Sequence, residues 1–110
     1  MNREFVMLPR FDLRWEQMGL NDEHLRQLQD QLMENPNIGV VVKGTGGLRK
    51  YRIQIENNKG KSGGARVCYV DIAVKERIYL ITAYPKSAQD NLSKEARNTI
   101  RELVIRLKGE

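Results

Sequence analysis

Hydrophobic residues recur at helical spacing in three parts of the chain. Phe11, Trp15 and Met18 lie at i, i+4 and i+7, which predicts a short helix from about residue 11 to residue 18. A longer stripe follows Asn21 and consists of Leu25, Leu28, Leu32 and Met33. The third stripe follows Ser93 and consists of Ala96, Ile100, Leu103, Val104 and Leu107. Asn21 and Ser93 are good N-cap residues, so each of these two helices is expected to begin directly after its cap.

Strand patterns occupy the middle of the chain and its beginning. Residues 48–56 alternate, with Tyr51, Ile53 and Ile55 on one side and polar residues on the other. Runs rich in Val, Ile and Tyr follow at residues 65–74 and 77–84, and a shorter apolar run lies at residues 4–8. The links between the three middle runs are short enough for hairpins, which predicts an antiparallel sheet.

The order of these elements predicts an α+β domain. One strand is followed by two helices, three further strands and a last helix, and no linker or repeat divides residues 1–110. We therefore expect a single domain in which the helices pack on one face of an antiparallel sheet. Its 40% hydrophobic residues suffice for one small core.

Composition and charge narrow the classes of function. No apolar run is long enough to span a membrane, and the N-terminus does not have the pattern of a secretory signal, so the cytoplasm is the expected compartment. The formal net charge is +5, and residues 43–86 contain ten basic and three acidic residues. A basic middle segment suggests nucleic acid, a ribosome or another polyanion as partner, whereas a solvated surface is the plainer interpretation.

The usual residues of metal and nucleophilic sites are scarce. His24 is the only histidine, and Cys68 is the only cysteine and lies inside an expected strand, where a buried, inert thiol is common. The Gly60–Ser62 segment reads Gly-Lys-Ser, but it does not have the preceding glycine that a phosphate-binding loop needs. We expect neither a metal nor a cofactor.

Cations on the expected strands are the remaining candidates for chemistry. Lys50 and Arg52 are two residues apart, so they project from the same face of a strand. A hairpin would bring Arg66 near them, and Lys86 follows the third strand of the middle segment. Cations held this close together are stabilised by an anion such as an RNA phosphate, which arginine binds through paired N–H donors. Ordinary exposed side chains are the alternative.

Several short segments carry motifs in a specific order. They are Gly44–Lys50 (GTGGLRK), Gly60–Val67 (GKSGGARV), Ile78–Leu80 with Tyr84–Lys86 (IYL and YPK), and Asp90–Ser93 (DNLS). In this order they resemble the RelE/ParE superfamily of bacterial toxins, and most closely its HigB-like branch. The resemblance runs from about Glu4 to Leu107 and implies a compact α+β fold.

The resemblance also implies an activity. RelE-like members are ribosome-dependent endoribonucleases that cut mRNA in the ribosomal A site, through attack of a 2′-hydroxyl on the adjacent phosphate. On that basis the expected catalytic residues are Lys50, Arg52, Arg66 and Lys86. Lys50 would act as the base or as a phosphate clamp, and Arg66 would stabilise the transition state. The residues expected to contact RNA or the ribosome are Lys43, Arg49, Lys59, Lys61 and Tyr84.

The sequence departs from the RelE prototype at two positions. Ser87 stands where the prototype has a further arginine, and no tyrosine follows Tyr84, although the prototype has one near its C-terminus. The general acid is therefore unassigned, with Tyr84 and Lys86 as the candidates.

The resemblance further implies a partner and leaves other functions open. Toxins of this branch are inhibited by a small helix-turn-helix antitoxin of the HigA-like kind, and the complex binds operator DNA. The other partner would be the ribosome with its mRNA, and no membrane is expected. The alternatives are a ParE-like, non-enzymatic inhibitor of DNA gyrase, a module that binds RNA or the ribosome without cutting, and a degenerate toxin that keeps only its antitoxin-binding surface.

Overall fold

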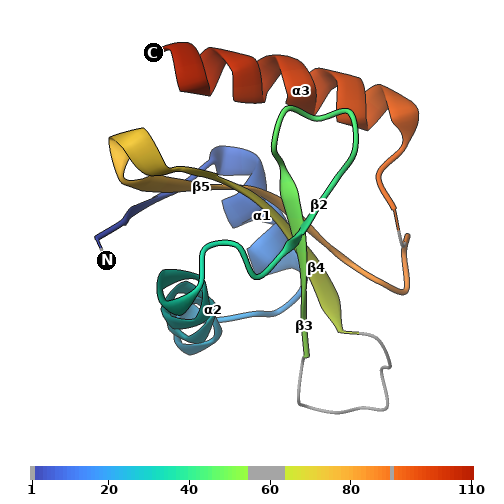
Figure 1. The fold of residues 1–110 in the computed structure, drawn as a ribbon. Coiled ribbons are helices and arrows are strands. Elements are labelled where there is room, and N and C mark those ends of the chain that lie inside the picture. Colours follow the sequence, from blue (N-terminus) through green and yellow to red (C-terminus); the bar gives the residue numbers. More distant parts are fainter. Residues whose placement is uncertain (1, 55–63, 90) are drawn as a thin grey trace.

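A computed structural model describes residues 2–54, 64–89 and 91–110, and within them a five-stranded sheet in the order β1-β5-β4-β3-β2 (Figure 1). The strands are β1 (Glu4–Met7), β2 (Val40–Val41), β3 (Arg49–Ile53), β4 (Ala65–Ile72) and β5 (Arg77–Pro85). The helices are α1 (Pro9–Gln17), α2 (Asp22–Glu34) and α3 (Lys94–Gly109), and a 3₁₀ turn (Ala73–Lys75) joins β4 to β5. The α+β class and the order of the predicted elements are confirmed, and β2 is an element that the pattern did not predict.

Side-chain caps start the two longer helices where the sequence predicts. The Asn21 side chain accepts a hydrogen bond from the His24 backbone N–H, and the His24 ring accepts one from the Asn21 N–H. The Ser93 hydroxyl oxygen likewise accepts from the Ala96 N–H at the start of α3. α1 begins at Pro9, whose fixed φ and missing N–H suit the first position of a helix.

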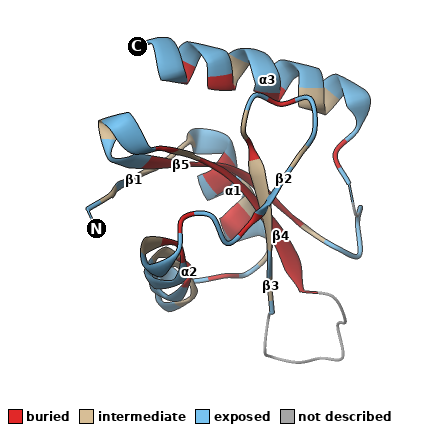
Figure 2. Cartoon of the chain, in the orientation of Figure 1, coloured by how far each residue is buried: buried red, intermediate tan, exposed pale blue. Residues whose placement is uncertain are grey.

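The sheet separates two hydrophobic cores because β4 and β5 are buried on both faces (Figure 2). Val67 and Tyr69 pack with α1 and α2, whereas Cys68 and Val70, which alternate with them, pack beneath α3. The expectation that all helices lie on one face is therefore wrong. Nearly continuous apolar strands are typical of sheets covered on both sides, so a helix is needed over each face.

β1 runs parallel to β5, which corrects the expectation of a purely antiparallel sheet. Glu4 pairs with Arg77 and Met7 pairs with Leu80 in this parallel register. The pairs β2–β3, β3–β4 and β4–β5 are antiparallel, as the short links predict. β1 is far from β5 in the sequence, so no hairpin dictates its direction.

A β-bulge in β5 changes which of its residues face each core. Cys68 is opposite Thr82, but the next residue of β4, Tyr69, is opposite Leu80, which leaves Ile81 as an extra residue. Before the bulge, Leu80 faces α1 and α2. Beyond the bulge, Tyr84 joins the core beneath α3. Even alternation from Leu80 would instead place Tyr84 on the face that α1 and α2 cover, together with Leu80.

A buried tyrosine holds the segment that leads into β2. The Tyr69 hydroxyl donates to the Pro36 carbonyl at 2.7 Å and accepts from the Gly39 N–H at 2.9 Å. Burial raises the pKa of this hydroxyl, so it keeps the proton that it donates. The Arg49 guanidinium binds the same segment, donating to the Gly39 carbonyl at 2.7 Å. These bonds fix the path of the chain beside the edge of the sheet.

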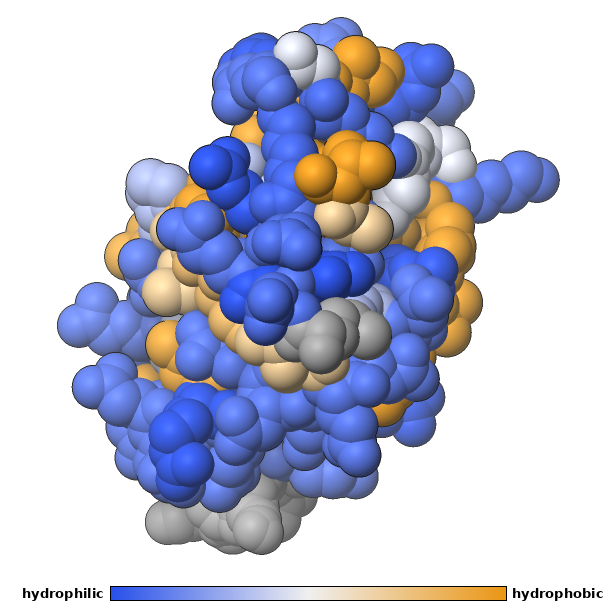
Figure 3. All heavy atoms as spheres, turned by 60° about the vertical axis from the view of Figure 1, so that its left-hand side comes forward, coloured by the Kyte–Doolittle hydropathy of each residue, from blue (hydrophilic) through white to orange (hydrophobic). Residues whose placement is uncertain are grey.

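The visible surface is mostly hydrophilic. Figure 3 shows hydrophobic residues scattered over one side of the molecule, with hydrophilic residues covering most of it. Within the part of the chain that the structure describes, no helix has both the length and the apolar composition required to cross a membrane.

Replacing Tyr69 by phenylalanine should lower the free energy of unfolding by about 1–3 kcal/mol, because it leaves the buried N–H of Gly39 and carbonyl of Pro36 without their partner. Urea titration followed by circular dichroism measures this loss. Tyr51→Phe is the matched control, since the Tyr51 hydroxyl donates to the Gln31 side chain at an exposed site. Equal losses in the two variants would contradict the anchoring role of Tyr69.

Candidate nucleic-acid interface

Three side chains form a line across the sheet at the end of β4. Arg52 of β3 is directly opposite Arg66 of β4, and Arg66 is directly opposite Tyr84 of β5. Side chains in such cross-strand pairs share a face and have Cβ atoms about 4.5–5.5 Å apart. We name Arg52, Arg66 and Tyr84 the cross-strand row. Tyr84 belongs to the core beneath α3, so the row lies on the face of the sheet that α3 covers.

Lys50 lies on the same face, one cross-strand pair along from the row. It pairs with Cys68, which pairs in turn with Thr82. Its ammonium donates to the Asn91 side-chain oxygen at 2.8 Å, which links β3 to the segment before α3. The structure therefore brings together Lys50, Arg52 and Arg66, as period-two spacing and the hairpin predict.

The three cations differ in their burial. Arg66 retains only 4% of its accessible surface, Lys50 is half-buried, and Arg52 is exposed. A buried guanidinium has few alternative orientations, so its N–H donors are held in place before a ligand arrives. Arg52, at the surface, can move to meet an incoming anion. The cation cluster of Lys50, Arg52 and Arg66 thus combines a rigid guanidinium, that of Arg66, with a mobile one, that of Arg52.

A hollow of about 390 Å³ opens beside these cations. Its lining includes the cations Lys50, Arg52 and Arg66 and the apolar side chains of Ile38 and Val40. Val40 is 70% exposed, which is unusual for an aliphatic residue in a strand. An apolar wall beside cations suits a ligand with both a phosphate and a flat organic group, such as a nucleotide.

Lys86 lies beside the start of β4. Its backbone N–H donates to the Gly64 carbonyl at 3.1 Å, directly after Pro85 pairs with Ala65. Its side chain is exposed. The fourth predicted catalytic residue is thus at the same end of the sheet as Arg66.

Two predicted contact residues lie away from the cluster. Arg49 is opposite Tyr69, on the face that α2 covers, and its guanidinium binds backbone carbonyls of the segment before β2. Lys43 is exposed in the turn between β2 and β3, which Lys108 ties to α3 through the Gly46 carbonyl. Lys59 and Lys61 lie outside the residues that the structure describes.

Some groups near the cluster were not assigned from the sequence. Ile38 and Val40 lie outside the strands that the pattern predicted, because β2 is only two residues long. Asn91 lies in the DNLS motif, but nothing in the motif indicated that it binds Lys50. Their positions depend on long-range contacts that a local pattern does not encode.

Cys68 is an inert thiol despite its position beside Lys50. It is fully buried, and this burial raises its pKa to about 12. A thiolate is the reactive form of cysteine, so at neutral pH this side chain does not act as a nucleophile. In the described part of the chain no group of three or more His, Cys, Asp or Glu residues could hold a metal ion.

The structure is thus a small α+β domain with a cluster of cations at one end of its sheet. A family model described as the RelE toxin of the RelE / RelB toxin-antitoxin system matches residues 10–109. The chain belongs to this family of toxins.

Solved structures of Escherichia coli RelE share the fold. A free RelE variant with two arginines replaced by alanine is 20% identical, with a TM-score of 0.59, over 82% of this chain and 90% of that one. The isolated RelE toxin is 17% identical, with a TM-score of 0.56, over 94% and 99%. RelE in the intact RelBE toxin-antitoxin complex is 20% identical, with a TM-score of 0.55, over 77% and 96%.

Gly64→Ala should destabilise the end of the sheet that carries Arg66. Gly64 has φ +56°, and a Cβ there would lie 2.0 Å from the Ile53 carbonyl oxygen, so the backbone must move. We expect the free energy of unfolding to fall by at least about 2 kcal/mol, as measured by urea titration. Gly44→Ala is the control, because Gly44 has φ +79° but an open space around it. A smaller loss for Gly64→Ala than for Gly44→Ala would contradict the close contact with Ile53.

Cys68 should resist alkylation by iodoacetamide at pH 8 in the folded protein and react readily in urea, because only unfolding exposes the thiol and returns its pKa to the ordinary range. Mass spectrometry of the intact protein measures the modified fraction. Rapid labelling without denaturant would contradict the buried, neutral state of Cys68.

Proposed function

We propose that this protein is a ribosome-dependent endoribonuclease that cuts mRNA in the ribosomal A site and so inhibits translation. Membership of the RelE toxin family supports the proposal. The observation that carries it is the convergence of Lys50, Arg52 and Arg66 on one face of the sheet, with Tyr84 beside them and Lys86 at the same end.

The proposed reaction is an internal transfer of a phosphoryl group. The 2′-oxygen of one nucleotide forms a bond to the adjacent phosphorus, and the bond from that phosphorus to the 5′-oxygen of the next nucleotide breaks. The 2′-hydroxyl proton passes to a base, and the departing 5′-oxygen takes up a proton. The products are a 2′,3′-cyclic phosphate and a 5′-hydroxyl.

The cations have complementary parts in this reaction. Arg66, held in place by its burial, donates to the phosphate oxygens on which negative charge increases in the transition state. Arg52 provides a second guanidinium from the surface. Lys50 either removes the 2′-hydroxyl proton or binds a phosphate oxygen, and the geometry is compatible with both roles. Tyr84 and Lys86 are the candidates for the acid that protonates the 5′-oxygen.

The partners follow from the same assignment. We propose a cognate antitoxin that inhibits the toxin, of the helix-turn-helix kind if the chain belongs to the HigB-like branch, and binding to operator DNA only through that complex. The other partner is the ribosome with its mRNA. Exposed Lys43, together with Lys59 and Lys61, is a candidate for ribosomal contacts.

Two alternatives share this fold. A ParE-like gyrase inhibitor has no need of three cations clustered beside an apolar hollow, so the geometry favours RNA cleavage. A module that binds RNA without cutting would use the same cations, but every one of them would then affect binding and none would affect the chemical step alone.

Cleavage of labelled mRNA on purified ribosomes tests the proposal. Arg52→Ala and Lys50→Ala should each lower the cleavage rate by about 100-fold or more, because each removes a group that contacts the reacting phosphate or the attacking 2′-hydroxyl. Arg26→Ala, which removes an exposed arginine from α2, is the matched control and should change the rate by less than about twofold. The products should carry 2′,3′-cyclic phosphate ends.

Other results would overturn parts of the proposal. Equal cleavage of mRNA without ribosomes would contradict ribosome dependence. An absence of cuts together with inhibited gyrase supercoiling would indicate the ParE-like class. Ribosome binding without cuts would indicate the non-cleaving module.

A further inference from the structure

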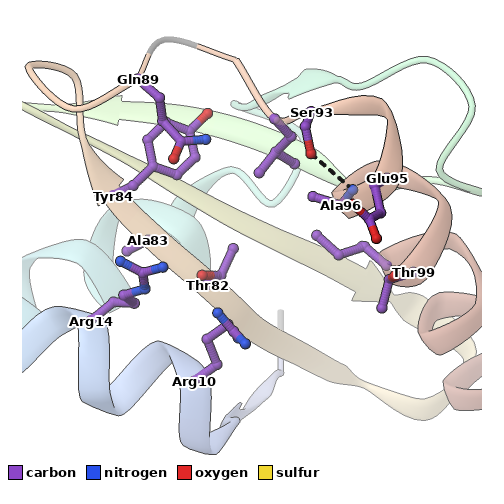
Figure 4. A pocket seen from close by; sticks show the side chains of 12 residues that line it. Arg10, Arg14, Thr82, Ala83, Tyr84, Gln89, Ser93, Glu95, Ala96 and Thr99 are labelled. Carbon is purple, nitrogen blue, oxygen red and sulfur yellow. Dashed lines mark hydrogen bonds between the residues drawn. The ribbon is translucent and has the colours of Figure 1, made fainter.

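A second hollow, of about 430 Å³, lies between α1 and the first half of α3 (Figure 4). It follows the part of β5 that continues beyond Leu80, the last residue that pairs with β1. Thr82 and Tyr84 line it from β5, Arg10 and Arg14 from α1, and Glu95 and Thr99 from α3. We name this hollow the α1–α3 groove.

Two arginines of α1 belong to the groove. Arg10 and Arg14 are four residues apart, so they lie on one side of the helix, while Phe11 and Trp15 on the adjoining side are buried in the core. Figure 4 shows both arginine side chains directed from α1 toward β5. Within the described ranges, neither guanidinium has a hydrogen bond or ion pair, so their donors are available to a ligand.

The charge and chemistry of the groove suit a nucleotide. Glu95 is an acidic residue in the lining, so the two arginines leave an excess of positive charge. The side chains of Leu92, Ala96 and Ile100 provide apolar surface. Polar side chains of the lining, such as those of Gln89 and Thr99, can bind the edge of a base, as in single-stranded RNA recognition.

The groove is continuous with the cross-strand row. Tyr84 is the last member of that row and also lines the groove, so the two sites meet at one side chain. The row spans about 10 Å, because neighbouring strands lie about 4.8 Å apart. An RNA strand that crosses the row from Arg52 past Arg66 would therefore enter the groove beyond Tyr84.

We propose that the α1–α3 groove binds a nucleotide that flanks the scissile phosphate in the same RNA strand, with Arg10 and Arg14 on its phosphate. This inference rests on the proposed function, because it takes the cross-strand row as the place of cleavage. Continuity with that row favours RNA over an acidic peptide, which the arginines alone would attract equally well. The groove lengthens the RNA-binding surface from one phosphate to at least two.

Binding of a fluorescent, non-cleavable 2′-O-methyl hexanucleotide, measured by anisotropy at low and moderate salt, tests the inference. The double variant Arg10→Ala/Arg14→Ala should raise the Kd by about 10-fold or more and reduce the slope of log K against log salt by about 0.7, since the contact to one phosphate is lost. Arg101→Ala/Arg106→Ala removes two exposed arginines from α3 and is the matched control, with an expected change below about twofold. Arg52→Ala should weaken binding of the same RNA.

A substitution that removes negative charge should strengthen RNA binding, and it tests the charge of the groove. Glu95→Gln should lower the Kd severalfold, because it removes a negative charge from the lining, whereas Glu102→Gln on the exposed side of α3 should not. Urea titration of each variant verifies that the fold is retained.

Three results would overturn the inference: an unchanged Kd for Arg10→Ala/Arg14→Ala, an equal loss in the control pair, or an absence of hexanucleotide binding by the wild-type protein at low salt. Because the oligonucleotide is not cut, these results are independent of the cleavage assay. Binding as expected without mRNA cleavage would support the groove as an RNA-binding site and reject the nuclease. Cleavage of mRNA together with an unchanged Kd for Arg10→Ala/Arg14→Ala would support the nuclease and reject the groove.

Discussion

Burial of β4 on both faces is the constraint on which the rest of the structure depends. α1 and α2 cover one side and α3 covers the other, so the middle of the strand accepts mainly apolar side chains. A charged residue is tolerated only where this cover ends, and Arg66 occupies that position. The two-sided core therefore confines the cations to one end of the sheet and restricts the movement of the most buried of them.

The sequence predicted those parts of the fold that depend on local chemistry. Asn21 and Ser93 start their helices because a side-chain oxygen satisfies a nearby backbone N–H, and such a bond requires only neighbouring residues. The parallel direction of β1 and the placement of α3 across the sheet depend on which faces remain to be covered. The nearly continuous apolar runs of β4 and β5 already carried that signal, because alternation would be expected if one face were solvated.

The candidate site was predictable to the extent that strand periodicity and pairing determine it. Lys50 and Arg52 share a face by their spacing, and the β3–β4 pairing adds Arg66. Arg49 was expected among the RNA contacts from the family resemblance, but it is adjacent to Lys50, and adjacent residues of a strand project to opposite faces. Arg10 and Arg14 have the pattern of a solvated helix side, and only the tertiary structure places them beside Tyr84.

The bulge at Ile81 lets β5 hold one more residue than its partner strand while Tyr84 keeps its place opposite Arg66. Tyr84 reaches the face of Arg66 only because the bulge shifts the alternation of β5 by one position. Deleting Ile81 would leave Thr82 opposite Cys68 and Tyr84 opposite Arg66, because removal of the extra residue restores an even alternation from Leu80. In a lineage of such toxins, a codon lost at this position would thus leave the cross-strand row intact, so a gap there in an alignment would not mark the loss of the proposed site.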